Sequence, residues 1–432
     1  MAVAPDMEVA MDINKILRGV DCSCGKRHTC LIQKVYIERN AAERLTDLCK
    51  EYDEILIVAD ENTYGAAGDK ATRALGDKRT RRVIFDGGKL LIPNEESIAV
   101  VRESLGDADL ILGIGSGVIQ DLCKYVAHLA KLPYMIFATA PSMDGYASDG
   151  AAMILGGMKE TVKAGLPRAI LADTEVMASA PMDMIRAGYG DIIGKYSALN
   201  DWRLSALVNG EYLCRYIYRV TEDMIARVLG LGESLQKRDE EAVRVLTEAL
   251  IVVGIMMSFA GSSRPASGSE HHLSHFFEIV GIVKKQPYFS HGVDVAYSTV
   301  VTARLRERLV KSPFPTSLYR EDGGVLENKL YEIYGPSAPS CIALQNRIGN
   351  YGCHRLHVYE EKENEIKEIL KDMPRSEEIE GYLGSIGLDT SDFYSEYGEE
   401  KISKAILYAK DLKDRYTVLW LYYDLFGGCS LL

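Results

Sequence analysis

One segment decides the fold of the first half of this chain: Leu110-Ile-Leu-Gly113-Ile-Gly115-Ser116-Gly117-Val-Ile-Gln-Asp121. An aliphatic run of strand length passes into a glycine-rich turn and then into a helix-like pattern. Glycines let the backbone approach a diphosphate, and the free amides of a helix N-terminus attract its charge. The spacing Gly-x-Gly-x-Gly is not the Rossmann Gly-x-Gly-x-x-Gly. A nucleotide loop and an ordinary strand-to-helix connection are therefore both open interpretations.

Short apolar runs of strand length surround this segment and alternate with helical patterns. They are residues 54–59, 82–85, 109–112, 134–138 and 169–172. Nearly continuous apolar strands separated by helices indicate a parallel sheet covered on both faces. Residues 146–167 are rich in Gly and Ala, which predicts a hairpin excursion from this alternation. The sequence predicts a mostly parallel, Rossmann-like α/β domain over residues 1–180.

The pattern changes after Pro181, where helical spacing replaces strand-like alternation. Apolar residues recur at three- and four-residue intervals, as an amphipathic helix requires, at Ile402, Ile406, Ala409, Leu412, Tyr416 and Leu419. We therefore expect an all-α domain over residues 181–432. The candidate metal ligands fall in this domain and the glycine loop in the first. This predicts an active site between the two domains, a common location for ligand pockets.

Composition limits the classes of function. The chain has 432 residues, a net charge of −12 and 47% hydrophobic residues. That acidic balance argues against general binding to nucleic acids or anionic membranes. The N-terminus lacks a signal-peptide pattern, and the longest apolar run, Ala249–Met257, is far shorter than the ~20 residues of a membrane span. We expect a cytoplasmic protein with reduced thiols, because its nine cysteines are an odd number.

An N-terminal cluster contains possible metal ligands in the segment Cys22-Ser-Cys24-Gly-Lys-Arg-His28-Thr-Cys30. Its spacing matches no zinc-finger pattern, and the sequence offers no second ligand pair nearby. The favoured interpretation is a turn with free thiols, and a bound metal is the alternative. The sequence alone leaves the role of this cluster open.

Three distant segments supply residues for one open metal site. Asp191 lies in Gly-Tyr-Gly-Asp-Ile-Ile-Gly-Lys, His271 in Ser-Gly-Ser-Glu-His-His-Leu-Ser-His, and His291 in Ser-His-Gly. Four of the eight histidines fall between residues 271 and 291. One carboxylate and two imidazoles leave coordination positions free, as catalytic sites do, whereas structural zinc sites usually have four protein ligands. The alternative is a chance cluster of helical histidines.

Two further segments fit the predicted edge of the sheet where ligands bind. Thr139-Ala-Pro-Ser142-Met-Asp144-Gly-Tyr-Ala-Ser148 follows one strand and presents hydroxyls and a carboxylate. Asp60 ends the strand Ile-Leu-Ile-Val-Ala-Asp. Its carboxylate is placed to accept hydrogen bonds from an adenosine ribose, although a helix N-cap is an equally ordinary role.

Together these motifs resemble the superfamily of dehydroquinate synthase and the iron-containing alcohol dehydrogenases, and within it the bacterial type of glycerol-1-phosphate dehydrogenase. The resemblance covers nearly the whole chain. It implies metal ligation by Asp191, His271 and His291, and substrate contacts from Asp144, Asp191 and His275. It implies that the dinucleotide is bound by Asp60, Gly115, Ser116, Gly117, Asp121, Thr139, Ser142 and Ser148.

The resemblance also implies an activity, which is the interconversion of dihydroxyacetone phosphate and sn-glycerol 1-phosphate with NAD(H) or NADP(H). The metal would be nickel, zinc or iron, and the assembly a homodimer. A polyol dehydrogenase and a dehydroquinate synthase-like lyase are the alternatives within the superfamily. The substrate phosphate needs cations that the acidic chain must supply locally, and Lys163, Lys195 and Arg264 lie in or near the matched segments.

Overall fold

The computed structural model describes residues 12–156 and 158–427, and the chain divides into two compact units. Unit 1 comprises residues 1–185 and 223–262, and unit 2 comprises residues 186–222 and 263–432. The chain first passes from unit 1 to unit 2 close to the predicted division between residues 180 and 181. The segment 223–262 then returns to unit 1 and carries the apolar helix α10 (Glu240–Ala260) into it.

Unit 1 contains the predicted parallel sheet. Its six strands lie in the order β3-β10-β7-β6-β4-β5, and every neighbouring pair is parallel. The five apolar runs form β4 (Glu54–Asp60), β5 (Arg79–Phe85), β6 (Leu110–Gly115), β7 (Tyr134–Ala138) and β10 (Ala169–Asp173). The sixth strand, β3 (Lys34–Glu38), lies at one edge of the sheet and was not predicted.

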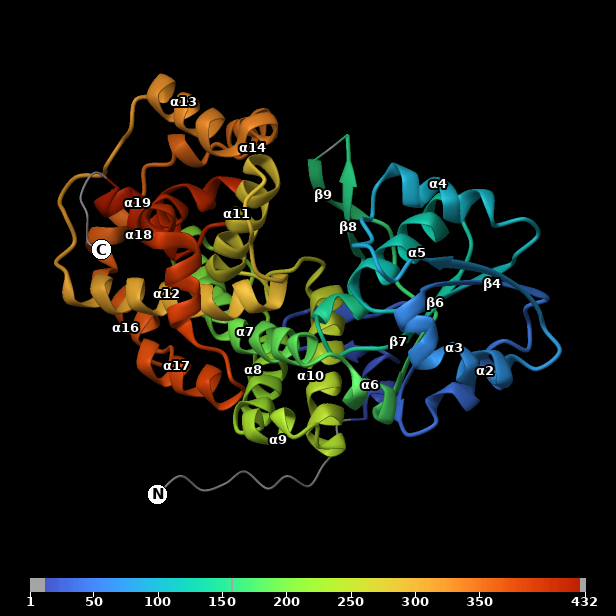
Figure 1. The fold of residues 1–432 in the computed structure, drawn as a ribbon. Helices are drawn as coiled ribbons and strands as arrows, with labels where there is room; N and C mark the ends of the chain where they lie inside the picture. The colour runs from blue at the N-terminus through green and yellow to red at the C-terminus, as the bar shows by residue number, and fades with distance from the viewer. Residues whose placement is uncertain (1–11, 157, 428–432) are drawn as a thin grey trace. The chain divides into compact units, whose positions relative to one another are not determined.

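Helices cover both faces of this sheet (Figure 1). Strand β4 shows why, because its side chains alternate between the faces as those of any strand do. Ile55 and Ile57 pack in one apolar cluster with η1 (Ala41–Arg44), α2 (Leu45–Leu48), α3 (Glu61–Leu75) and α6 (Thr174–Ser179). Leu56 and Val58 pack in the other cluster with α4 (Glu95–Glu103) and α5 (Gly117–Ala130).

The predicted hairpin excursion is confirmed. Strands β8 (Gly150–Leu155) and β9 (Met158–Lys163) form an antiparallel pair of their own. Before them lies the short 3-10 helix η2 (Asp144–Ala147), which packs against α10. A Cβ at Gly254 of α10 would lie 2.6 Å from the Asp144 carbonyl oxygen, so only glycine permits this approach. Smaller elements of unit 1 are α1 (Ile13–Ile16), β1 (Val20–Asp21), β2 (Arg27–His28) and α9 (Gly232–Gln236).

Helix α10 is the one described helix that is long and apolar enough to cross a membrane by length and composition. However, 78% of its most apolar window is buried inside the protein. It contacts α6, β3 and η2, and its buried residues run from Ala242 to Phe259. This pattern is that of a core helix of unit 1.

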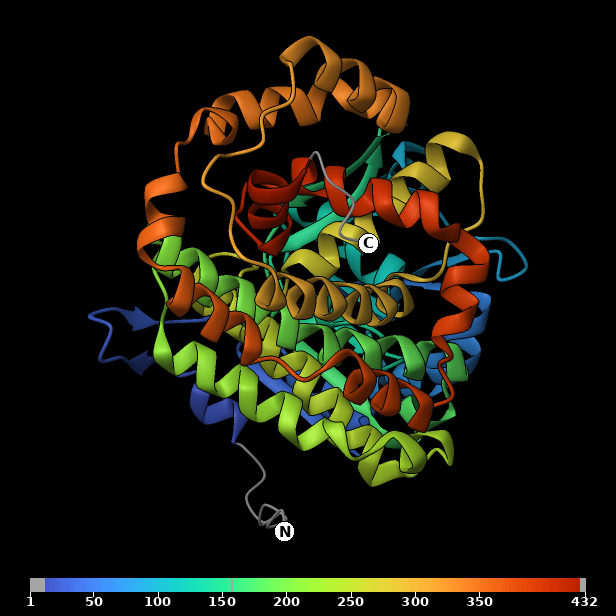
Figure 2. The ribbon, with the colours of Figure 1, turned by 90° about the vertical axis from the view of Figure 1, so that its left-hand side faces the viewer.

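All secondary-structure elements among the described residues of unit 2 are helices, joined by loops. Helix α12 (His291–Lys311) packs against α11 (Ser269–Lys284), α16 (Glu363–Lys371), α17 (Ser376–Ser385) and α19 (Val418–Phe426). Figure 2 shows α12 in yellow-orange among the orange and red C-terminal helices. The other helices are α13 (Gly323–Tyr334), α14 (Ala338–Ile348), α15 (Leu356–Glu361) and α18 (Thr390–Tyr408), with the 3-10 turns η3 (Gly335–Ser337), η4 (Asn350–Gly352) and η5 (Ala409–Leu412). Helices α7 (Met182–Asn209) and α8 (Arg215–Leu229) belong to unit 2 from residue 186 and up to residue 222, respectively, and their remaining residues belong to unit 1.

The helix predicted from the apolar stripe between Ile402 and Leu419 is wrong beyond residue 408. Helix α18 ends at Tyr408, η5 follows, and α19 begins only at Val418. Thr417 caps α19, because its hydroxyl accepts a hydrogen bond from the Leu419 amide. A capping threonine inside the stripe favours a new helix start over continuation. The predicted α/β domain followed by an all-α part is otherwise confirmed.

Candidate active site

Helices α7, α11 and α12 bring Asp191, His271 and His291 together within unit 2. One ligand atom from each lies within 4.8 Å of the other two. Asp191 and His271 are buried, and His291 is partly exposed. Three residues separated by 80 and 20 positions in sequence thus converge on one point, and one of them is partly exposed. An open site of this kind suits a metal that must also bind a substrate.

Neighbouring polar groups orient both imidazoles. The Glu270 carboxylate lies 2.7 Å from Nδ1 of His271, which leaves Nε2 to face Oδ1 of Asp191 at 3.5 Å. The Ser274 hydroxyl lies 3.4 Å from Nδ1 of His291. Histidines that bind metals commonly donate their second N–H to a carboxylate or another acceptor, which fixes the tautomer. Sequence reasoning missed Glu270 and Ser274, although both stand inside the motif that contains His271.

The charges around Asp191 favour its ionised form. Burial alone would raise the pKa of this carboxyl, but Lys195 and the hydrogen bond from His271 outweigh it and hold the pKa well below the usual range. Nζ of Lys195 lies 2.5 Å from Oδ1 of Asp191, and both side chains are buried. The pKa of His271 is raised above its ordinary value. Burial alone would lower this pKa, but the hydrogen bonds with Asp191 and Glu270 outweigh burial.

The donor set fits a divalent metal. An ionised carboxylate and two oriented imidazoles offer one oxygen and two nitrogen ligands, which suit zinc, nickel and iron alike. His275 lies one helical turn after His271 on α11. Its ring centroid is 6.3 Å from that of His271 and 5.4 Å from that of His291. The His275 ring therefore lies next to the rings of His271 and His291.

The predicted nucleotide segments meet at one point of the sheet in unit 1. After β4 the chain forms β5, which lies on one side of β4 in the sheet. The next strand, β6, lies on the opposite side of β4, and β7 follows beyond β6. The order of strands therefore reverses between β4 and β6. In open α/β sheets, ligands bind outside the carboxyl ends of the strands at such a switch point. Asp60 ends β4 and Gly115 ends β6.

The glycine loop has close neighbours on both sides. Its Gly115 packs so tightly against α5 that a Cβ there would lie 2.6 Å from the Ile119 Cβ. The Gly115 carbonyl accepts a hydrogen bond from the Thr139 amide, which joins this loop to the one that follows β7. Ser116 is the N-cap of α5, and its side chain makes no capping hydrogen bond. The first backbone N–H groups of α5, from Gly117 onward, therefore receive no hydrogen bond from a capping side chain at this edge of the sheet.

Three residues assigned to ligand contact also have structural roles. Asp121 accepts a hydrogen bond from the Ala152 amide and thereby holds β8 against α5. The Ser148 hydroxyl donates to the Gly150 carbonyl, 3.4 Å away. Asp144 begins η2, next to the loop of Ser142. Buried Lys124, which the sequence did not single out, donates to the carbonyls of Gly145 and Gly150 and fixes the same segment.

Asp60 is the N-cap of α3. Its carboxylate accepts a hydrogen bond from the Thr63 amide at 2.8 Å, and the Thr63 hydroxyl lies 3.1 Å from the Asp60 amide. This reciprocal capping box accounts for an acid at this position without a ligand. The capping alternative is therefore present in the structure, and a role in binding a ribose remains a prediction.

The three candidate cations for a phosphate all have carboxylate partners. Lys195 pairs with Asp191, and Lys163 is exposed and pairs with Asp149. The Arg264 guanidinium forms two hydrogen bonds with Glu211. Two further cations, Lys413 and Arg415, escaped the sequence analysis. Burial lowers the pKa of His272 well below its ordinary value, and the nearby charges of Arg415, Lys413 and Arg264 lower it further.

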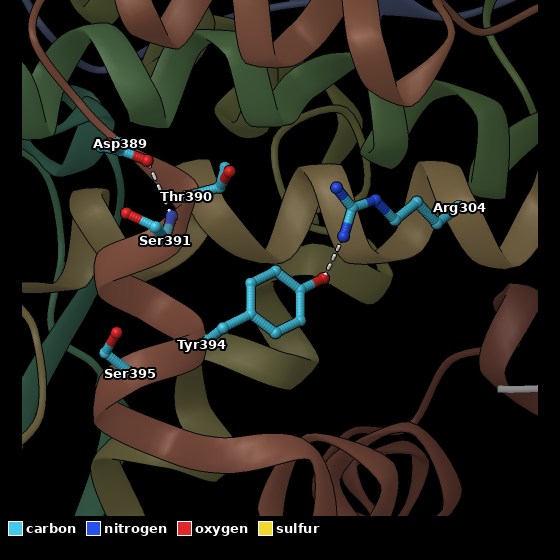
Figure 3. A pocket seen from close by; sticks show the side chains of 6 residues that line it. All are labelled: Arg304, Asp389, Thr390, Ser391, Tyr394 and Ser395. Carbon is cyan, nitrogen blue, oxygen red and sulfur yellow. Dashed lines mark hydrogen bonds between the residues drawn. The ribbon is translucent and has the colours of Figure 1, made fainter.

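An open surface pocket in unit 2 lies apart from these residues. Figure 3 shows its lining, in which Arg304 donates to the Tyr394 hydroxyl and the Ser391 amide to Asp389. Arg304 also pairs with Glu380. None of the predicted site residues lines this pocket, and its one cation already has a partner. The pocket therefore does not compete with the metal ligands as the candidate active site.

Comparisons with known proteins agree with this geometry. Residues 36–181 match the family model described as iron-containing alcohol dehydrogenase. The chain is 31% identical over 296 residues to glycerol-1-phosphate dehydrogenase [NAD(P)+] of Geobacillus stearothermophilus, covering 67% of this chain and 73% of that one. It is 44% identical over 240 residues to the enzyme of that name from Sulfurisphaera tokodaii, covering 52% and 67%.

The fold is shared with solved structures of other proteins. Sulfoacetaldehyde reductase from Bifidobacterium kashiwanohense, solved in complex with NAD+, superposes with a TM-score of 0.60 at 12% identity. The superposition covers 92% of this chain and 97% of that one. Such low identity bears on the fold alone. The sequence relatives, in contrast, are similar enough over enough of their length to place this chain in the glycerol-1-phosphate dehydrogenase family, among the iron-containing alcohol dehydrogenases.

Proposed function

We propose that this protein interconverts dihydroxyacetone phosphate and sn-glycerol 1-phosphate with NAD(H) or NADP(H) and one divalent metal. The observation that carries this proposal is the convergence of Asp191, His271 and His291, with Glu270 orienting one imidazole. The sequence relatives with this named activity support the choice of substrate. The glycine loop at the switch point of the sheet supports the use of a dinucleotide.

Each group has a task in this reaction. A metal held by the three ligands supplies Lewis acidity toward a carbonyl oxygen. Glu270 keeps His271 in the tautomer that leaves Nε2 free to bind. His275 stands beside the ligands and is positioned to donate the proton that the product alcohol needs, since an imidazole titrates near neutral pH. The loop of Gly115, Ser116 and Gly117, with Thr139, Ser142 and Ser148, holds the dinucleotide.

The substrate phosphate requires cations, and we place its anchor at Lys413 and Arg415 of unit 2. Nη1 of Arg415 donates to the Ser267 carbonyl, in the motif that precedes His271. Among the described residues, Nε of Arg415 has no hydrogen-bond partner. Burial lowers its pKa to about 10, with neighbouring Arg264 adding to the effect. The Asp414 carboxylate lies 3.9 Å from this Nε, and the Arg415 side chain is only 12% exposed. A mostly buried guanidinium near other cations favours a bound anion.

The metal, the assembly and the compartment are also part of the proposal. Nickel or zinc is the expected metal, with iron as the alternative. The oxygen and nitrogen donors suit all three metals. A homodimer in the cytoplasm is the expected state. Elemental analysis of the purified protein, size-exclusion chromatography with light scattering and cell fractionation test these three points separately.

The activity is tested by offering sn-glycerol 1-phosphate, sn-glycerol 3-phosphate and glycerol separately, each with NAD+ or NADP+ and a metal panel. Nicotinamide absorbance should rise with the sn-1 isomer alone. Glycerol should be poorer by ~10³-fold or more, because it has no phosphate to bind the cationic anchor. Comparable oxidation of the sn-3 isomer, or faster oxidation of glycerol, contradicts the proposal. The second outcome would indicate a polyol dehydrogenase.

A dehydroquinate synthase-like lyase makes a different prediction, because its nicotinamide is restored within each turnover. It would show no net change in absorbance with any of these substrates. The phosphate anchor has its own test in Arg415→Gln, which should raise KM for sn-glycerol 1-phosphate at least about tenfold and leave glycerol oxidation unchanged. Arg203→Gln is the matched control, since Arg203 pairs with Asp372 at the surface.

A further inference from the structure

The N-terminal hairpin of unit 1 brings three metal-ligating side chains together. Strands β1 and β2 pair Val20 with His28 and Asp21 with Arg27. Between them the chain turns back at Gly25, whose amide donates to the Cys22 carbonyl and whose φ is +84°. This tight turn places ligand atoms of Cys22, Cys24 and His28 within 4.8 Å of one another. Among the described cysteines, none forms a disulfide.

The imidazole of His28 is held in the orientation that a metal ligand requires. Its Nδ1 lies 3.1 Å from the Phe259 carbonyl oxygen, so this nitrogen carries the proton and donates it. Nε2 is therefore the atom with the lone pair, and it lies 3.4 Å from Sγ of Cys24. The ring is 2% exposed and is stacked on Phe259 with centroids 5.4 Å apart. Such an outer partner is typical of histidines that bind metals.

The distances match tetrahedral zinc. With Zn–S of about 2.3 Å and Zn–N of about 2.0–2.1 Å, a tetrahedral angle separates a bound sulfur and nitrogen by about 3.6 Å. The observed separation of Sγ of Cys24 and Nε2 of His28 is 3.4 Å. Cys30 is the nearest further thiol in sequence and is not part of this group. It forms hydrogen bonds with the Ile32 backbone and the Ser258 side chain instead.

We propose that Cys22, Cys24 and His28 bind a structural zinc ion, separate from the metal at Asp191, His271 and His291. Binding converts the two thiols to thiolates and releases their protons to solvent. Two sulfur donors favour zinc over magnesium or calcium, and a fourth ligand closes the site as in other structural zinc centres. The ion would tie the hairpin to the C-terminal end of α10 through His28 and Phe259. This proposal does not depend on the proposed function.

Cobalt substitution of the full-length protein tests the site, because Co²⁺ bound by thiolates absorbs in the near ultraviolet and Co²⁺ bound by Asp and His alone does not. Titration of the reduced, metal-free protein with Co²⁺ should produce this thiolate band, which should be complete when one equivalent has bound at the hairpin. Added Zn²⁺ should displace the Co²⁺ and abolish the band. The Cys22→Ser/Cys24→Ser variant should lose the band and one equivalent of bound zinc. Cys30→Ser, the matched control, should keep both.

A His271→Ala variant separates this proposal from the catalytic metal. This variant should keep the thiolate band of the hairpin site while it loses the metal bound by Asp191, His271 and His291. The two metal proposals can therefore fail independently. A wild-type protein without the thiolate band, or a band that survives in the double serine variant, overturns the proposal. If that variant fails to fold, protection of the wild-type thiols by Zn²⁺ against a disulfide reagent gives the answer instead. Serine variants of the other cysteines identify the fourth ligand.

Discussion

Gly190 and Gly292 face each other where helices α7 and α12 meet, and this contact sets the distance between two of the proposed metal ligands. A Cβ at Gly190 would lie 2.6 Å from the Gly292 carbonyl oxygen. A Cβ at Gly292 would lie 2.1 Å from the carbonyl oxygen of Ala187. Each glycine is next in sequence to a ligand, Asp191 in one case and His291 in the other. The motifs Gly-Tyr-Gly-Asp and Ser-His-Gly therefore combine a ligand with the small residue that lets its helix approach.

Gly292→Ala should push α12 away from α7 and move His291 relative to Asp191. Displacements of about 1 Å in an active site cost about 10²-fold in rate. We expect a loss of that order with metal affinity reduced in the same variant, measured by steady-state kinetics and metal titration. Gly381→Ala is the matched control, because this glycine of α17 has open space at its Cβ position. Equal effects of the two substitutions would contradict the packing argument.

Glu270→Gln should weaken metal binding while it preserves the shape of the side chain. The amide keeps an oxygen for the N–H of His271 but removes the charge that stabilises the bound imidazole. Loss of such outer partners typically costs about 10- to 100-fold in metal affinity. Competition with a chromophoric chelator measures this affinity. Asp191→Ala, His271→Ala and His291→Ala should instead abolish both bound catalytic metal and turnover, and full activity in any of them would refute the ligand assignment.

His275→Ala should separate catalysis from metal binding. We expect its catalytic metal content to match that of the wild type, because the three ligand atoms converge without it. Its kcat should fall by about 10²- to 10⁴-fold if the imidazole moves a proton in the rate-limiting step. The pH profile of kcat should also change, because the group that moves the proton is removed. An unchanged profile with a modest rise in KM would show that His275 only positions the substrate.

The sequence predicts the central strands of unit 1 well, because strands buried on both faces are continuous apolar runs. Edge strand β3 was missed, since only Val35 among its residues is buried and the rest of Lys-Val-Tyr-Ile-Glu mixes charged and apolar side chains. The stripe from Ile402 to Leu419 misled for a related reason. Periodicity reports which residues are buried, and a 3-10 turn with a loop can bury residues at nearly helical spacing.

The site was predictable in its ligands and less so in its surroundings. Histidines and an acid in rare clusters identify possible ligands, and the resemblance joins them across the chain. Partners such as the Glu211 carboxylate for Arg264, or the Phe259 carbonyl for His28, depend on contacts between segments far apart in sequence. No local pattern contains them. The Cys22, Cys24 and His28 group shows the same limit, because its spacing matched no known finger and the hairpin geometry alone brings it together.

Asp60 offers a test that separates capping from cofactor choice. Asp60→Ser retains an N-cap oxygen for the Thr63 amide, whereas Asp60→Ala removes it and should cost about 1 kcal/mol of stability. If the carboxylate also repels a 2′-phosphate, both variants should shift the ratio of kcat/KM for NADH and NADPH toward NADPH. An expected effect of about 1–2 kcal/mol corresponds to roughly 5- to 30-fold. A ratio unchanged in both variants would leave Asp60 with its capping role alone.

Asp294 of α12 should make folding stability depend on pH. Burial raises the pKa of its carboxyl well above the ordinary value, and the nearby charge of Glu278 raises it further, while the Tyr397 hydroxyl bond and Lys401 lower it. The fold therefore favours the protonated form. The stability that this preference contributes is fully present below the unfolded pKa, about 3.9. It is lost as pH rises through the folded pKa.

Asp294→Asn removes this titration and keeps a similar shape. The wild type should therefore lose stability relative to the variant as pH increases from about 4 to 8. The free energy of unfolding of the variant, minus that of the wild type, should increase over this range. Urea unfolding of the metal-free proteins at several pH values measures the difference. Asp389→Asn is the control, because the amide of Ser391 lowers the pKa of the exposed Asp389. That lowered pKa confines its dependence to acid conditions, with stability lost as pH falls. A difference for Asp294→Asn that stays flat between pH 5 and 8 would show that the buried carboxyl is fully stabilised as an anion by Tyr397 and Lys401.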